Sequence, residues 1–139
     1  MQRLLIAICF SLIATVAVAD VRILSSSGGE VSGYLRLFSQ LRRSGERIVI
    51  DGPCLSACTL VLSTIPRNRI CVTSKAVLGF HAPQLVDQLG RKARSSQITR
   101  AVAASYPAAV RAWIQRNGGL KQKLIFLRGR QLSAIYPRC

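Results

Sequence analysis

The pattern of apolar and polar positions predicts alternating strands and helices. Short apolar runs at Val21–Leu24, Ile48–Ile50, Ile70–Val72 and Ala76–Phe80 have the length of strands. The run Ile48–Ile50 is apolar throughout, which is typical of a strand buried on both faces of a parallel sheet. These segments predict a sheet whose strands are joined by helices.

Three segments carry the spacing or the compact apolar composition of helices: 31–44, 56–63 and 95–115. The first should end at Ser44-Gly45, and Pro107 should kink or break the third. The glycine-rich segment 25–29 and Asp51-Gly52-Pro53 predict turns. The apolar segment Leu120–Leu127 fits either a last helix or a strand, and an irregular tail follows it.

The N-terminus has the pattern of a secretory signal peptide. Arg3 precedes the apolar run Leu4–Ala19, which ends in the small-x-small sequence Ala17-Val18-Ala19. We therefore expect residues 1–19 to be cleaved and residues 20–139 to form one exported domain, periplasmic or secreted. The alternative is an inner-membrane anchor formed by residues 4–19, although this run is shorter than the about 20 apolar residues that span a bilayer.

The charge of the chain is strongly positive. Its formal net charge is +15, and cleavage would remove one basic residue, Arg3, and no acidic residue, leaving +14. Such an excess attracts anionic partners, such as a membrane surface, an acidic polysaccharide or a nucleic acid. Aromatic residues make up only 6% of the chain, so stacking on bases has little support. A solvated basic surface is favoured over nucleic-acid binding.

Cleavage would also remove Cys9, and four cysteines would remain: Cys54, Cys58, Cys71 and Cys139. An even number of cysteines in an oxidising compartment predicts disulfides, with three pairings open. A bond between Cys54 and Cys58, or from either to Cys71, would staple the turn around Ser56. A redox thiol is disfavoured because the pair lacks the Cys-x-x-Cys spacing that lowers a thiol pKa.

Two predicted strand-to-helix junctions carry candidate chemistry. The turn at Gly28-Gly29 offers backbone N–H groups to an anion, and Ser56 presents a hydroxyl where a helix dipole favours negative charge. Each feature alone also fits a tight turn or an N-cap serine. The single histidine, His81, closes the strand 76–80 and has no recognised zinc-ligand spacing, so we expect neither a metal nor another cofactor.

Three segments resemble, in the same order, the proteolytic subunit of Clp protease: Ser25–Val31, Cys54–Cys58 and Leu78–Pro83. In that family a Ser-Pro-Gly-Gly turn supplies an oxyanion-hole amide, an Ala-Ser-Met-Gly segment holds the nucleophile, and an Ile-His-Gln-Pro segment holds the base. Residues 130–134, Arg-Gln-Leu-Ser-Ala, are similar to its Arg-Phe-Leu-Ser-Ala segment. The chain is closer still to exported bacterial relatives with Cys-x-Ser-Ala-Cys-Thr and Gly-Phe-His-Ala-Pro segments.

The resemblance implies an α/β fold of the ClpP/crotonase type. Such a fold has repeated β-β-α and βαβ units and a mainly parallel sheet covered by helices, here with a shortened C-terminal helical part. It also implies that Ser56 attacks a carbonyl, that His81 accepts the serine proton, and that the amides of Gly29 and Ala57 hold the oxyanion.

The chain departs from the family at the acid that completes the triad. The family's aspartate falls in Leu124-Ile125-Phe126-Leu127, where this chain has no acid. Asp87, Asp51, a backbone carbonyl or no group at all would then orient His81, and Asp87 is the acid we favour for that role. A missing orienter costs orders of magnitude in rate.

Three classes of function follow. The first is a serine hydrolase acting on peptides or other acyl substrates, with a homo-oligomer as in the family. The second is a catalytically inactive Clp-like fold used for binding or structure, and the third is a cationic periplasmic protein that acts through its charge. A crotonase-type acyl-CoA enzyme is set aside, because an exported protein would not meet coenzyme A.

Overall fold

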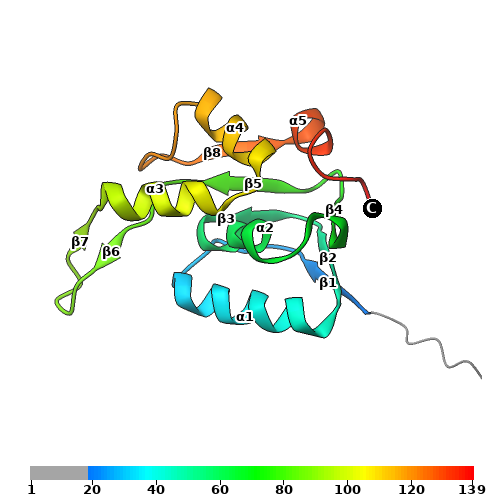
Figure 1. Cartoon of the computed structure of the whole chain (residues 1–139), viewed down its shortest axis with the longest axis horizontal. Coiled ribbons are helices and arrows are strands. Elements are labelled where there is room, and N and C mark those ends of the chain that lie inside the picture. The colour runs from blue at the N-terminus through cyan, green and yellow to red at the C-terminus, as the bar shows by residue number, and fades with distance from the viewer. Residues whose placement is uncertain (1–18) are drawn as a thin grey trace, which may run out of the picture.

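Two small sheets and a separate hairpin make up the strands of the computed structural model, which describes residues 19–139 (Figure 1). The first sheet is parallel, in the order β1 (Asp20–Ile23), β2 (Arg47–Ile50), β4 (Ile70–Val72). The second has the order β3 (Pro53–Leu55), β5 (Val77–Phe80), β8 (Ile125–Arg128), with β3 and β5 parallel and β8 antiparallel to β5. The hairpin joins β6 (Leu85–Val86) to β7 (Lys92–Ala93).

The predicted mainly parallel sheet is therefore divided, because the chain crosses to the second sheet after each strand of the first. After β1, Ser26 forms a parallel bridge with Cys54, and the strands β2 and β4 lead directly to β3 and β5. Gly52 makes the second crossing, where any Cβ would overlap the carbonyl oxygen of Leu24. We predicted residues 51–53 as a simple turn, and β3 was missed because a sharp bend between two strands has the same sequence signals as a turn.

The helical segments are α1 (Val31–Ser44), η1 (Ser56–Leu60), α2 (Val61–Thr64), η2 (Arg67–Arg69), α3 (Ser96–Ser105), α4 (Ala108–Arg116) and α5 (Gly129–Ser133). The predicted end of the first helix is confirmed, since Gly45 follows α1 in a left-handed conformation with φ of 84°. Pro107 separates α3 from α4, so the predicted kink is a full break. The segment left open as helix or strand contributes β8, and the tail contains α5.

The core lies between the helices and both sheets. Ile48, Val49 and Ile50 are fully buried, which confirms the prediction for this strand, and each such side chain stabilises the fold by about 1.5–3 kcal/mol. In Figure 1, α1 lies below β1 and β2, whereas α4, α5 and β8 form the upper part of the molecule. Phe80 packs edge-on against Tyr106, with ring centroids 5.2 Å apart. The end of β5 is thereby fixed against the junction of α3 and α4.

Two disulfides staple the described residues. Cys54 bonds to Cys58 and joins β3 to η1, and Cys71 bonds to Cys139 and joins β4 to the last residue of the chain. The prediction that the four cysteines form disulfides is confirmed. Of the predicted signal peptide, residues 1–18 lie outside the described part of the chain. Within residues 19–139, no helix combines the length and apolar character needed to cross a bilayer.

Candidate active site

The fold brings Ser56 and His81 together because they follow two paired parallel strands. Leu55 lies opposite Gly79 in the pairing of β3 with β5, so both strands end at the same edge of the sheet. Ser56 Oγ and His81 Nε2 are 2.7 Å apart, a distance typical of a strong hydrogen bond. Both side chains are only partly exposed. The predicted nucleophile and base are thus in contact.

Ser56 has a strained backbone. Its φ is 55°, and it is the one non-glycine residue with a positive φ among residues 19–139. A left-handed conformation costs an L-residue about 1–2 kcal/mol, and such strain concentrates at functional sites. In serine hydrolases a sharp strand-to-helix turn of this kind exposes the nucleophilic hydroxyl. A solely structural N-cap serine needs no such strain, since N-cap residues have extended backbone angles.

Gly28 packs directly against the turn that carries Ser56. A Cβ at Gly28 would lie 2.6 Å from Ser56 Cβ, 2.7 Å from the carbonyl oxygen of Leu55 and 3.0 Å from the amide nitrogen of Ala57. The segment before it is paired to β3 as well, because Ser26 N donates to the carbonyl of Pro53 and Leu55 N donates to that of Ser26. Only glycine fits here, a close approach that the sequence signals only as a turn.

The predicted oxyanion-hole amides lie beside this contact. Gly29 directly follows Gly28, and its N–H donates to no acceptor within the described residues. Ala57 is the second residue of η1, so its N–H precedes the first intrahelical hydrogen bond. Both amides are therefore free to bind an external acceptor next to Ser56. The structure places Gly28, which we did not assign, nearer to the serine turn than its position in the sequence suggests.

A buried chain of hydroxyl groups supports Ser56 from below. Thr59 Oγ1 donates to the carbonyl oxygen of Ser56 at 2.6 Å, so the hydroxyl of Tyr106, 2.7 Å away, donates to Thr59 Oγ1. Thr59 is fully buried. Burial raises the pKa of Tyr106 to about 12, so this phenol stays a neutral donor across the physiological range. The chain links the α3–α4 junction to the strained residue, and no sequence motif announces it.

Replacing Thr59 by valine, which has the same shape, should disrupt this chain and leave the Tyr106 hydroxyl buried without a partner. We expect the free energy of unfolding to fall by about 1–3 kcal/mol, and the reactivity of Ser56 toward a fluorophosphonate to fall as well. Urea denaturation and labelling rates measure the two effects. Thr59→Ser keeps the hydroxyl and is the control, and equal labelling of both variants would show that the chain does not position Ser56.

The structure does not place Asp87 at the histidine ring. Asp87 is in the β6–β7 hairpin and pairs with Arg91 at 2.6 Å, and this bond, with the backbone N–H groups of Arg91 and Leu89, holds the pKa of its carboxyl below the usual value. His81 Nδ1 is buried and has no hydrogen-bond partner within residues 19–139. The predicted orienting role of Asp87 is therefore wrong for this conformation.

The remaining alternatives fare no better. Asp51 is bonded to Thr73 and Arg22, and the Thr73 hydroxyl is the largest cause of its lowered pKa. Phe80 pairs with Ile125, so extending the antiparallel register by one residue sets Leu124 opposite His81. The position nearest the histidine on β8 is thus apolar. This explains why Nδ1 lacks an acidic partner.

The disulfide between Cys54 and Cys58 encloses Ser56 and ties the two ends of its turn. Both cysteines are buried, at 0% and 1% exposure. Because this short covalent loop restricts the backbone on either side of Ser56, we expect it to hold the serine in its strained conformation. The other disulfide anchors the C-terminus instead.

Removing the first disulfide with the double variant Cys54→Ala/Cys58→Ala should therefore lower the labelling of Ser56 by more than its loss of stability explains. The matched control is Cys71→Ala/Cys139→Ala. Each removal should cost about 2–5 kcal/mol, measured by denaturation, but only the first should slow labelling of the folded protein. If the control variant slows labelling equally, the enclosing loop has no special role.

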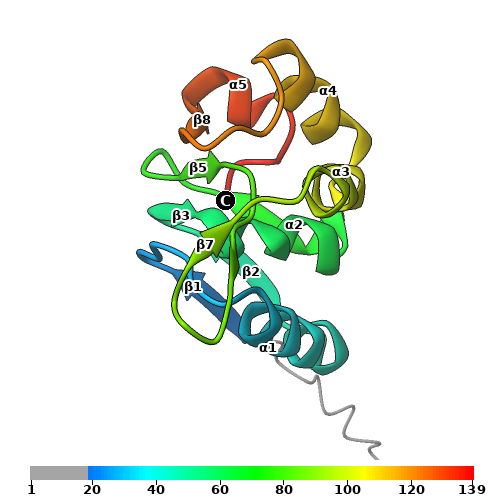
Figure 2. The same ribbon diagram turned by 90° about the vertical axis from the view of Figure 1, so that its left-hand side faces the viewer.

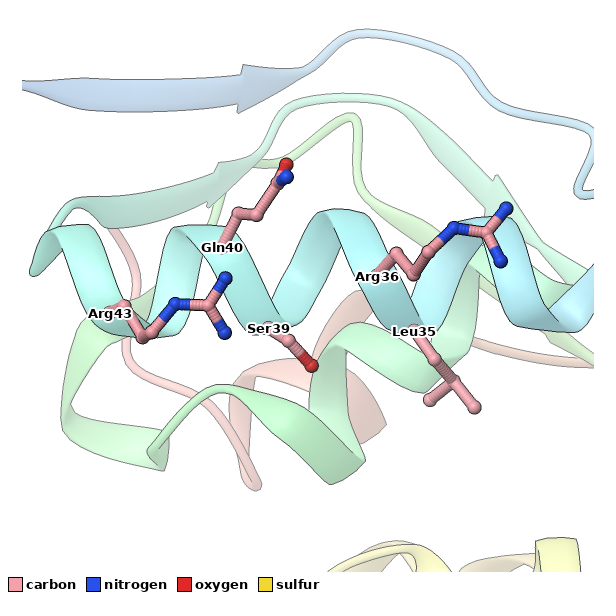
Figure 3. Close-up of a pocket in the computed structure, with 5 residues that line it drawn as sticks. All are labelled: Leu35, Arg36, Ser39, Gln40 and Arg43. Atoms are coloured by element: carbon pink, nitrogen blue, oxygen red, sulfur yellow. The ribbon is translucent and has the colours of Figure 1, made fainter.

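No other described cluster competes with this site. Within residues 19–139, no three His, Cys, Asp or Glu side chains gather in a way that could hold a metal ion. A shallow pocket of about 370 Å³ lies on the surface of α1 and is lined by five residues of that helix: Leu35, Arg36, Ser39, Gln40 and Arg43 (Figure 3). It contains no paired nucleophile and base.

Comparison with known proteins adds no family. No protein-family model matches the chain, and no curated protein matches it. The functional argument therefore rests on the geometry around Ser56 and His81.

Proposed function

We propose that this protein is a serine hydrolase, with Ser56 as nucleophile and His81 as general base, acting on peptides or other acyl substrates. The observation that carries the proposal is the 2.7 Å contact between Ser56 Oγ and His81 Nε2. It joins two residues 25 positions apart in the sequence, one of them in a strained backbone conformation. A serine hydroxyl is a weak nucleophile until a base within hydrogen-bond reach takes its proton.

The proposed reaction follows from the positions of four groups. With its own proton on Nδ1, His81 accepts the Ser56 proton at Nε2 while Oγ attacks the substrate carbonyl. The N–H groups of Gly29 and Ala57 stabilise the negative oxygen that forms. His81 then gives the proton to the leaving group, and a water molecule, activated by the same ring, hydrolyses the acyl-enzyme.

The family assignment is part of the same proposal. Three successive strand pairs cross from the first sheet to the second, and a helical segment follows each crossing, as a ClpP/crotonase-like fold requires. Two disulfides favour an oxidising compartment, which supports export by the predicted signal peptide. We therefore favour an exported Clp-protease-like hydrolase working with a Ser-His dyad.

One observation favours a second candidate function, that of an inactive Clp-like protein used for binding. No acid orients the imidazole, because His81 Nδ1 has no partner among the described residues. In serine proteases, changing the orienting aspartate lowers turnover by about 10⁴-fold. A site of this kind can keep its shape and its ability to bind acyl groups while its turnover becomes negligible.

Acyl-enzyme formation separates the two candidates. The mature protein is incubated with p-nitrophenyl acetate, and the release of p-nitrophenol is followed together with the intact protein mass. A hydrolase should gain one acetyl group on Ser56 and then lose it. A protein that releases no p-nitrophenol above the level of Ser56→Ala, while remaining folded, belongs to the binding class.

A further inference from the structure

A basic pocket begins one residue beyond the candidate base. This pocket of about 420 Å³ is lined by Ala82, Arg94, Ser95, Ser96, Thr99, Arg100, Leu120 and Lys121, and we call it the cationic pocket. Ala82 follows His81 directly, so the wall of the pocket starts about 3.8 Å from the histidine along the chain. A second pocket of about 360 Å³, along α3 and α4, shares Arg100 and Leu120 with it. Together they extend the candidate site along α3.

The charges of the cationic pocket are not neutralised within the fold. All five acidic residues of the chain are described, and the ion pairs they form are Arg22–Asp51, Arg47–Asp20 and Arg91–Asp87. Arg94, Arg100 and Lys121 take part in none of these. Three cations around one cavity repel one another, and an anion bound between them relieves that repulsion.

The walls of the pocket are held in place. Ala82 N donates to the carbonyl oxygen of Lys121 at 2.7 Å, which ties the end of the β5 segment to the loop before β8. Ser95 caps α3 by accepting from Ile98 N. Thr99 Oγ1 donates to the carbonyl of Ser95, which strengthens the same turn. Arg94, Arg100 and Lys121 therefore project from anchored backbone, as a preformed subsite requires.

We propose that the cationic pocket binds a carboxylate of the substrate. The substrate would then be a peptide or acyl compound with an acidic group close to the scissile carbonyl. Guanidinium groups recognise carboxylates through paired, charge-assisted hydrogen bonds, which gives Arg94 and Arg100 the leading role and Lys121 a supporting charge. The inference rests on the proposed function, since it places the pocket beside a reacting Ser56.

The test measures binding without catalysis. In a Ser56→Ala background, which cannot form an acyl-enzyme, the binding of rhodamine-labelled peptides is followed by fluorescence anisotropy at physiological salt. One peptide carries two adjacent glutamates and an amidated C-terminus. The second has glutamines instead, and the third is the glutamine peptide with a free terminal carboxylate. The double variant Arg94→Gln/Arg100→Gln is compared with Arg36→Gln/Arg43→Gln in the pocket on α1 (Figure 3), which removes the same charge elsewhere.

The glutamate peptide should bind more tightly than the glutamine peptide. The Arg94/Arg100 double variant should weaken its binding about tenfold or more, and the Arg36/Arg43 variant should leave it nearly unchanged. Preference for the third peptide, lost in the same variant, would assign the subsite to a terminal carboxylate. Equal losses in both double variants, or no discrimination between peptides, would overturn the proposal. Either result leaves acyl-enzyme formation at Ser56 as a separate measurement, so the two proposals fail independently.

Discussion

Replacing Ser56 by alanine should abolish labelling of the folded protein by a fluorophosphonate probe, and replacing His81 by alanine should slow labelling by about a hundredfold or more. The reason is the 2.7 Å contact between Ser56 Oγ and His81 Nε2, through which the histidine can take the hydroxyl proton. Without Oγ there is no nucleophile. Without the imidazole the hydroxyl stays protonated in the attack. Labelling rates, measured by intact mass over time, report both effects.

Two controls keep this prediction interpretable. Ser56→Ala should change the free energy of unfolding by no more than about 1–2 kcal/mol, the range of a helix-start hydroxyl. Asp87→Asn should label like the wild type, because the Asp87 carboxylate bonds to Arg91 in the hairpin. A His81→Ala protein that labels at the wild-type rate would contradict the dyad. Slow labelling of Asp87→Asn would show that the hairpin moves and that Asp87 reaches the ring after all.

Gly28→Ala should have the second largest effect, on both stability and reactivity. The added Cβ would lie 2.6 Å from Ser56 Cβ and 3.0 Å from Ala57 N, so the serine turn or the glycine turn must shift. The φ of Gly28, 84°, adds strain of about 1–2 kcal/mol for any L-residue. We expect loss of more stability than this strain explains, together with nearly complete loss of labelling, because the nucleophile and the amides around it move together.

Gly45→Ala is the matched control for Gly28→Ala. Gly45 has the same φ of 84°, but a Cβ there has no atom within 4 Å. It should lose only the backbone strain and should label like the wild type. Denaturation curves and labelling rates of the two variants, measured side by side, separate strain from contact. If both variants behave alike, Gly28 serves only as a turn and its packing on Ser56 has no functional weight.

The sequence predicted the elements best where apolar periodicity was long or a breaker was strong. The helix ending at Gly45, the buried strand Ile48–Ile50 and the interruption at Pro107 all depend on local signals that tertiary contacts did not override. The order of Ser56 and His81 in strand-to-helix and strand-end positions was also legible. Parallel pairing of the two strands then brings the residues together, as the register of Leu55 with Gly79 shows.

The parts that could not be predicted depend on contacts between distant residues. The strain at Ser56 arises because its turn is compressed between Gly28 and the η1 helix, and single-residue propensities do not encode such a fit. The hydroxyl chain from Tyr106 to Thr59 spans 47 residues. Asp87 was the nearest acid in the sequence after His81, yet a hairpin turns it toward Arg91. Sequence proximity was a poor guide because two-residue strands leave almost no periodic signal.

The central claim is that folding makes Ser56 reactive through His81, and peptide mapping of the probe adduct tests it most directly. The mature protein is labelled with a fluorophosphonate, once folded and once in denaturant, then digested and analysed by tandem mass spectrometry. The account predicts a single adduct on Ser56 in the folded sample and none in the denatured sample. An adduct on another serine, equal labelling of many serines, or no adduct on a folded protein would contradict it.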